Sequence, residues 1–141
     1  MRDLFNNIHP LRGISPQVAV TDNTAFVSEI IDMKGYQSLT WLLLSGSLAD
    51  ADTVLTVLIE DGDVANLSDA AAVSDDLLLG TEALAGFTFA DDNETRKIGY
   101  VGHKRYVRLT VTPANNAGAI YLAAIAVLGH PTLSPTVNPP V

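Results

Sequence analysis

The chain has 141 residues, no cysteine and a formal net charge of −8 at pH 7. This length fits one domain with a sizeable core, and the lack of cysteine excludes disulfides, thiolate metal ligands and cysteine nucleophiles. The acidity disfavours nucleic-acid binding, and no apolar run approaches the ~20 residues that span a bilayer. We therefore expect no nucleic-acid partner, no membrane span and, from the polar N-terminal residues, no secretory signal.

The first 16 residues show no regular pattern and are interrupted by Pro10, Gly13 and Pro16. Because proline and glycine weaken regular elements, we expect residues 1–16 to form an extended N-terminal arm. The candidates for contacts between this arm and a neighbouring molecule are its apolar residues Leu4, Phe5 and Ile8.

The first strands are predicted at residues 18–20, 24–32 and 36–45. The middle one should place Phe26 and Ile30 on one face. The last alternates, with Leu39, Trp41 and Leu43 on one face, but its other face is also apolar, with Leu42 and Leu44. A strand that is apolar on both faces lies in the centre of a sandwich or contributes to an interface.

Residues 53–60 predict another strand, whose inward side chains are Leu55, Val57 and Ile59. Residues 63–83 lack a clear period, so we expect a loop with at most one helical turn near residues 69–73. Short strands are predicted at 84–90 and 94–101, separated by an acidic turn.

The clearest period-2 pattern lies in residues 104–112, where Val107, Leu109 and Val111 face one way and polar or basic side chains face the other. A loop rich in Asn and Gly separates these residues from a second apolar run at 119–128. Two strands joined by such a loop predict an antiparallel hairpin.

Seven or eight strands at intervals of roughly ten residues predict an all-β protein. We expect a single-domain antiparallel β-sandwich, with jelly-roll or Greek-key-like topology, over residues 17–129. Four prolines exclude a helix or a central strand from residues 130–141. This tail is either a disordered end or an extended arm that docks on a neighbour through three apolar anchors, Leu133, Val137 and Val141.

Charge is distributed unevenly along the chain. Residues 50–94 contain twelve Asp and Glu and no Lys or Arg, whereas residues 96–108 contain five Lys and Arg and no acid. The basic strand either pairs with acids on adjacent strands of its own fold or presents a surface to a partner. Its candidate contact residues are Lys104, Arg105, Tyr106 and Arg108.

No catalytic motif is present. The chain has no Gly-x-Ser-x-Gly elbow and no phosphate-binding glycine loop. Its three histidines, His9, His103 and His130, have no partner at metal-ligand spacing. The sequence therefore predicts a protein that is not an enzyme, with no metal and no cofactor, and it leaves surfaces and assembly as the basis of function.

Residues 99–112, residues 123–131 with their Leu-Gly-His-Pro ending, and the opening residues 1–8 resemble a group of small tailed-bacteriophage virion proteins. These proteins are encoded beside the major capsid protein and are regarded as head decoration, or cement, proteins. The similarity extends over most of the chain, including residues 36–40 and the acidic middle. It implies a β-sandwich or jelly-roll protein that oligomerises on the outside of a capsid and clamps neighbouring subunits.

We therefore expect a non-enzymatic structural protein of the virion, made in the host cytoplasm and located on the outer capsid surface. Its expected partners are the major capsid protein and copies of itself, as a dimer or trimer. One alternative is a ligand- or carbohydrate-binding β-sandwich module, although Trp41 lies in an apolar strand where core burial is the better interpretation. Another is a different phage structural role, in the tail or as a head–tail connector.

Overall fold

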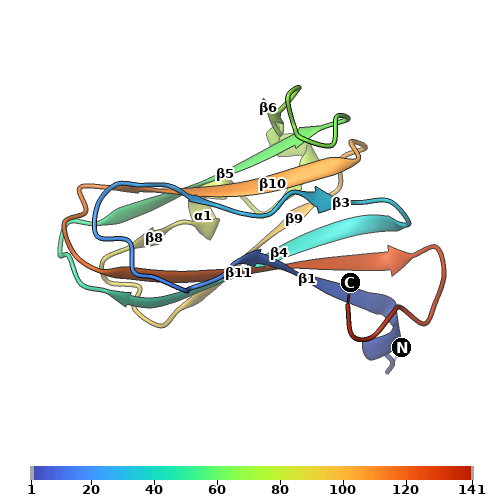
Figure 1. The fold of residues 1–141 in the computed structure, drawn as a ribbon, viewed down its shortest axis with the longest axis horizontal. Helices are drawn as coiled ribbons and strands as arrows, with labels where there is room; N and C mark the ends of the chain where they lie inside the picture. Colours follow the sequence, from blue (N-terminus) through green and yellow to red (C-terminus); the bar gives the residue numbers. More distant parts are fainter. Residues whose placement is uncertain (1, 141) are drawn as a thin grey trace.

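The computed structural model describes residues 2–140 and shows two antiparallel β-sheets packed face to face (Figure 1). The predicted all-β, single-domain antiparallel sandwich is confirmed. Over residues 2–140 there are eleven strands instead of seven or eight, because strands also form at residues 8–14, 71–72 and 78–79, where none was expected, and the strand expected at residues 24–32 is divided in two. Within residues 2–140 the helical elements are short, namely η1 Phe5–Asn7, η2 Asp75–Leu77 and α1 Glu82–Ala85. None of them is long and apolar enough to cross a membrane.

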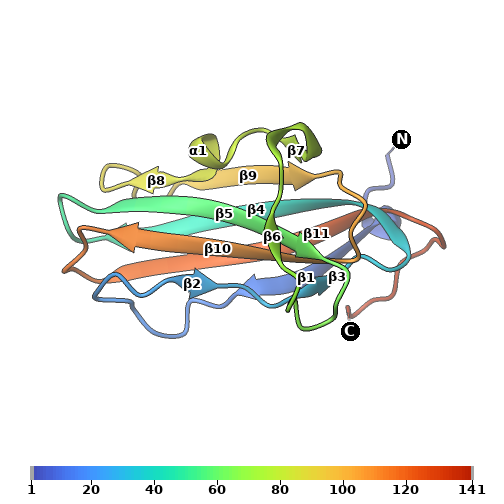
Figure 2. The ribbon, with the colours of Figure 1, turned by 90° about the horizontal axis from the view of Figure 1, so that it is seen from above.

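The first sheet, here called sheet A, has the strand order β1-β11-β4-β9-β7. These strands are, in that order, Ile8–Ile14, Ile120–Pro131, Tyr36–Leu48, Thr95–Tyr100 and Leu78–Leu79. Sheet B has the order β2-β10-β5-β6, with β3 also paired to β10 and β8 to β5. Its strands are Phe26–Val27, Tyr106–Ala114, Val54–Gly62, Ala71–Ala72, Ile31–Asp32 and Phe87–Thr88. Figure 2 shows α1 and β7 along one long edge of the sandwich and β2 along the opposite edge.

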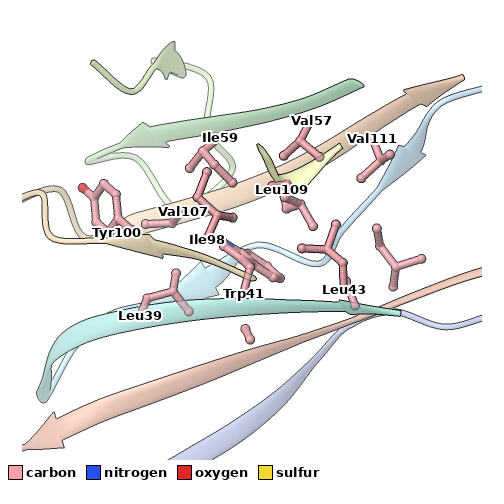
Figure 3. Packing of buried hydrophobic residues seen from close by; sticks show 14 of the residues in the cluster. Leu39, Trp41, Leu43, Val57, Ile59, Ile98, Tyr100, Val107, Leu109 and Val111 are labelled. Carbon is pink, nitrogen blue, oxygen red and sulfur yellow. The ribbon is translucent and has the colours of Figure 1, made fainter. Parts of the chain in front are cut away.

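The core lies between the two sheets, where alternate side chains of the long strands interdigitate (Figure 3). Trp41 of β4 is 0% exposed, and the facing strands of sheet B contribute Ile59 and Leu109, both also 0% exposed. Burying each large aliphatic side chain of this kind stabilises the fold by about 1.5–3 kcal/mol. The inward faces predicted for β4, β5 and β10 are therefore confirmed, because one-sided burial makes strands alternate.

The predicted hairpin between residues 104–112 and 119–128 is wrong. β10 pairs with β5 over its whole length in sheet B, whereas β11 pairs with β1 and β4 in sheet A. The connecting loop crosses between the sheets and is fixed by the buried Asn116. The Oδ1 of Asn116 accepts a hydrogen bond from Thr53 at 2.8 Å, and its Nδ2 donates to the backbone oxygens of Asp22 and Gly118.

Residues 1–16 are not an arm without regular structure, because β1 occupies residues 8–14 and pairs antiparallel with β11. β1 is an edge strand of sheet A. Pro10 is tolerated there because no further strand pairs with the outer side of β1 and needs its backbone N–H. Gly13 lets the backbone approach the core closely, since an added Cβ there would lie 2.6 Å from Trp41. The two residues that obscure the strand in the sequence thus suit its position in the sheet.

The strand expected at residues 24–32 is divided into β2 and β3. Ser28 lies between them and is buried. Its hydroxyl accepts a hydrogen bond from the Leu109 amide at 2.9 Å and donates to the Glu29 carbonyl at 2.8 Å. This local bonding breaks the alternation, so that Ile31 instead of Ile30 is the residue buried in the core.

Three further predictions need correction. The helical turn expected near residues 69–73 lies instead at α1, where Thr81 caps the helix by accepting a hydrogen bond from the Leu84 amide at 3.1 Å. The strand at 84–90 is reduced to the two residues of β8. The strand at 18–20 is reduced to one bridge between Val20 and Ile120.

Candidate interaction surfaces

The basic residues proposed as contacts on the β10 side lie beside acids of the same chain. Arg105 donates two hydrogen bonds to the carboxylate of Asp32, at 2.9 and 2.8 Å, and its guanidinium lies 5.0 Å from the ring centre of Tyr106. These charge-assisted bonds hold the pKa of Asp32 below its ordinary value. Lys104 pairs with Asp63. The alternative in which the basic strand pairs with acids of its own fold is therefore the one that the structure shows.

Arg108 completes this pattern on the outer face of sheet B. It lies directly opposite Glu60 in the β10–β5 ladder, and the two side chains form an ion pair at 2.8 Å. Both are partly buried, at 27% and 20% side-chain exposure. A paired, half-buried charge contributes register to a sheet and is less available to a partner than a free one.

Beside this region lies a buried polar contact that the sequence did not indicate. The hydroxyl of Tyr100 donates to the Asp61 carboxylate at 2.7 Å and accepts a hydrogen bond from the Lys104 amide at 3.1 Å. Burial and the hydrogen bond to Asp61 raise the pKa of Tyr100 well above its ordinary value. Gly102 is required here, because a Cβ at that position would lie 2.4 Å from the Tyr100 hydroxyl. The contact is structural, since it fixes the β9–β10 connection.

The N-terminal and C-terminal segments come together at one end of the sandwich (Figure 1). The tail is held against its own chain: Thr136 donates from its amide to the Asn6 carbonyl at 3.0 Å and from its hydroxyl to the Ile8 carbonyl at 2.6 Å. Ser134 also donates to the Asn6 carbonyl, at 3.0 Å. The hydroxyls of Ser134 and Thr136 thus bond to the chain's own N-terminal segment, while the apolar tail residues Leu133 and Val137 stay exposed.

Four exposed apolar residues define what we call the terminal end: Leu4, Phe5, Leu133 and Val137, at 69%, 68%, 84% and 61% exposure. The structure thus brings the predicted contact residues of the two termini to the same end of the molecule. Ile8 differs, because it begins β1 and is only half-buried. Val141, the last predicted anchor, lies outside the described residues.

A second apolar surface lies on the outer face of sheet A. Below, "the outer face of sheet A" refers to its four exposed apolar residues, Leu42, Leu44, Tyr121 and Ile125. They are 43%, 49%, 44% and 48% exposed. Ile125 lies directly opposite Leu42 in the β11–β4 ladder, and Ala123 lies opposite Leu44. A surface depression of about 500 Å³ runs over these two strands and the adjacent β9. The two-sided apolar pattern of residues 36–45 was the signal for this surface in the sequence.

The histidines lie apart from one another and from any cluster of ligands. His9 is buried and stacks on Tyr36 with ring centres 5.5 Å apart, while His130 is exposed and hydrogen-bonded to Ser38 at 2.9 Å. His103 is exposed in the β9–β10 connection. Over residues 2–140, no group of three His, Cys, Asp or Glu is arranged to hold a metal ion.

Neither a protein-family profile nor a curated protein matches the sequence. Among solved structures, the chain is similar to a family two carbohydrate esterase from Cellvibrio japonicus, at 10% identity and a TM-score of 0.42 over 92% of this chain. It spans only 36% of that esterase. It is also similar to the SPBc2 prophage-derived protein YomS (12% identity, TM-score 0.38, 86% of this chain and 93% of that one). A third similar structure is the xylan-binding module CBM15, at 9% identity and a TM-score of 0.42 over 93% of this chain and 95% of that module. At these identities and TM-scores we draw no conclusion about function from the three structures.

Proposed function

We propose that this chain is a non-enzymatic structural protein of a phage virion, which decorates and cements the capsid by bridging neighbouring major capsid subunits. The observation that carries the proposal is the exposure of apolar side chains on two surfaces, the terminal end and the outer face of sheet A. Single exposed apolar residues are ordinary, but adjacent ones indicate contact with another molecule. The choice of a capsid as partner comes from the resemblance of residues 99–112 and 123–131 to phage decoration proteins.

The terminal end supplies the contact with the shell in this proposal. Its tail residues Ser134 and Thr136 are hydrogen-bonded to the chain's own N-terminal segment, so the tail is ordered before it meets a partner. Ordering a segment in advance lowers the entropic cost of binding. Leu133 and Val137 are then presented outward beside Leu4 and Phe5 and can insert between neighbouring capsid subunits.

Cementing requires no single strong contact. Each bound copy holds two adjacent subunits, so the second contact forms at high effective concentration once the first is made. A weak apolar contact repeated over a shell therefore adds substantial resistance to disassembly. The rigid sandwich keeps the terminal end and the outer face of sheet A at a fixed separation, as a clamp between subunits requires.

The test uses the variant Leu133→Asp/Val137→Asp, which keeps the tail but places charge on the terminal end. Shells assembled from the major capsid protein of the same phage are mixed with each variant. Bound copies per shell and the temperature of shell disruption are then measured. We expect the variant to lose most of its occupancy and all of the added heat resistance, because burying an unpaired carboxylate is costly.

The matched control is Leu84→Asp, which places the same charge on a 72% exposed leucine of α1, outside both surfaces. It should bind and stabilise shells as the unmodified chain does. Full occupancy by the tail variant would remove the terminal end from the mechanism. Failure of the unmodified chain to bind any shell would refute the proposed function itself.

The carbohydrate-binding alternative receives no support from the aromatic residues. Trp41, the aromatic residue best suited to stack on a sugar ring, is 0% exposed and therefore cannot contact a ligand at the surface. Among residues 2–140 the exposed large aromatic side chains come from separate segments: Phe5 from η1, Phe89 from the connection after β8 and Tyr121 from β11. A different phage structural role would show itself by symmetry, since native mass spectrometry of a connector would give a closed ring of many copies.

A further inference from the structure

β1 is the longest of the strands that end the two sheets over residues 2–140. It spans Ile8–Ile14, whereas β7 at the other end of sheet A and the outer strands β2, β3, β6 and β8 of sheet B have two residues each. Edge strands present backbone N–H and C=O groups that can pair with another chain, and very short ones limit that hazard. The outer edge of β1 is therefore where the sandwich most needs protection from pairing between chains.

The ladder between β1 and β11 shows which backbone groups lie on this outer edge. In an antiparallel pair, successive residues direct their N–H and C=O groups alternately toward the partner strand and away from it. The Ile8 carbonyl faces away from β11, because it accepts a hydrogen bond from the tail. Pro10 and Arg12 follow at intervals of two and face the same way, whereas His9 and Leu11 face β11. The outer edge of β1 thus consists of the backbone groups of Ile8, Pro10 and Arg12.

The second half of this edge is largely closed without the tail. Pro10 has no N–H to offer. At the register shift between Arg12 and Ile14, the Gly13 carbonyl turns outward and accepts a hydrogen bond from the Glu29 amide at 3.0 Å. Arg12 is different, because over residues 2–140 no hydrogen bond reaches its outward backbone groups. One N–H and one C=O on this half of the edge are therefore open.

The C-terminal tail closes the first half of the edge. The Thr136 hydroxyl donates to the Ile8 carbonyl at 2.6 Å, and the Thr136 amide donates to the Asn6 carbonyl, just before β1, at 3.0 Å. The Ser134 hydroxyl donates to the same Asn6 carbonyl at 3.0 Å. Residues 132–140 form no strand, and side-chain hydroxyls make two of these three bonds. A segment held by so few contacts detaches at low free-energy cost.

We propose that residues 132–136 are a strap that closes the outer edge of β1 and prevents it from pairing with strands of other chains. While the strap is bound, an incoming strand meets the tail at Ile8 and no N–H at Pro10, and only the groups of Arg12 are available to it. Once the strap detaches, Ile8 joins Arg12 in presenting outward groups on the same edge. An extended segment of another chain can then add to sheet A beside β1.

The inference goes beyond the proposed function and does not rest on it, so its test uses the free full-length chain without any shell. Ser134→Ala/Thr136→Val removes both hydroxyls of the strap. Below the unfolding temperature this variant should associate roughly tenfold faster than the unmodified chain, because losing two hydrogen bonds raises the detached fraction by about that factor. Light scattering and thioflavin T fluorescence over a concentration series measure the rate, and thermal unfolding verifies that the fold is retained. An unchanged rate, or no association by either chain, overturns the proposal.

Two control variants separate the strap from a general effect of composition. Ser134→Thr/Thr136→Ser exchanges the two side chains but keeps both hydroxyls. Ser68→Ala/Thr112→Val makes the same two losses at exposed positions outside the tail. Both controls should associate at the rate of the unmodified chain. Equally fast association by the Ser68→Ala/Thr112→Val chain would show that lost hydroxyls alone cause the effect, and the strap would then be refuted.

Hydrogen exchange identifies the surface through which the chains associate. The Arg12 amide is open in the free chain and should become protected in the associated Ser134→Ala/Thr136→Val chain, because an added strand would pair with it. Association that leaves the Arg12 amide exchanging as fast as in the free chain would place the contact on another surface. That result overturns the proposal even if the strap variant associates faster.

Discussion

Arg108 and Glu60 lie directly opposite each other on β10 and β5, and their side chains form a 2.8 Å ion pair that is about three-quarters buried. The pair joins the basic strand of the sequence to the acidic segment that precedes it. The charge asymmetry between residues 50–94 and 96–108 is thus satisfied in part within sheet B. Apolar side chains at the terminal end and on the outer face of sheet A also remain exposed.

Arg108→Glu should lower the free energy of unfolding by about 1–2 kcal/mol, because it places two partly buried carboxylates opposite each other. Urea denaturation measures the change. The double variant Arg108→Glu/Glu60→Arg restores an ion pair in the reversed sense and should recover most of the loss. If the single variant unfolds at the same urea concentration as the unmodified chain, the pair contributes nothing to the fold. Self-association should be unchanged in both variants.

Tyr100→Phe should cost about 1–3 kcal/mol near neutral pH, because the buried Asp61 carboxylate loses the hydroxyl that donates to it. The pKa of Tyr100 is raised in the folded chain from the ordinary 10.0. Its contribution to stability is therefore complete below about pH 10 and declines as the pH rises toward the folded pKa.

The pH dependence follows from that sign. Stability of the unmodified chain should fall between about pH 9 and pH 11 by more than that of Tyr100→Phe, so the difference between the two chains should shrink in alkali. Denaturant titrations at several pH values measure it. A difference in stability that stays constant over this range would show that the pKa of Tyr100 is not raised in the folded chain.

Gly13→Ala should destabilise the sandwich by about 1–3 kcal/mol, the usual cost of overpacking a core. The new Cβ would lie 2.6 Å from the Trp41 ring and 2.8 Å from the Ala124 carbonyl oxygen, and the backbone oxygen cannot give way easily. Thermal unfolding measures the loss, and the fluorescence of Trp41, the only tryptophan, should shift with it. An unchanged unfolding temperature would mean that β1 does not pack as closely as the structure shows.

The alternation of side chains predicted the core well, and it did so for a physical reason. In β4, β5 and β10 one face is buried, so apolar residues recur at every second position, and this period identifies the residues of the core. β1 could not be recognised in this way. Its Pro10 and Gly13 suit an edge strand that packs against a bulky core residue. That context exists only in the folded structure, where β1 pairs with β11 and Gly13 lies against Trp41.

The pairing of strands was beyond the sequence for a different reason. A loop such as 115–118 can join neighbours in one sheet or partners in facing sheets, and its length does not distinguish the two. The decisive contacts are those of Asn116 with Thr53 and Asp22, which are distant in the sequence.

For the exposed apolar surfaces, the apolar second face of residues 36–45 indicated either a central strand or an interface. β4 is the central strand of sheet A and also leaves Leu42 and Leu44 exposed.

The tail offers the last prediction, which concerns its attachment to its own chain. Ser134→Ala/Thr136→Val removes the hydroxyls that donate to the carbonyls of Asn6 and Ile8, while the size of each side chain changes little. The tail should then detach more often, because an exposed segment held by few hydrogen bonds opens at low free-energy cost. Hydrogen exchange at the Thr136 amide, which donates to Asn6, should become faster, and proteases should cleave residues 132–140 more readily. The global unfolding temperature should stay the same, since the sandwich does not depend on the tail.

Leu133→Ala is the matched control: that side chain points away from the chain, so its loss should leave both the exchange rate and the cleavage unchanged. Equal protection of the tail in the double variant would show that the tail is held by something other than these two hydroxyls.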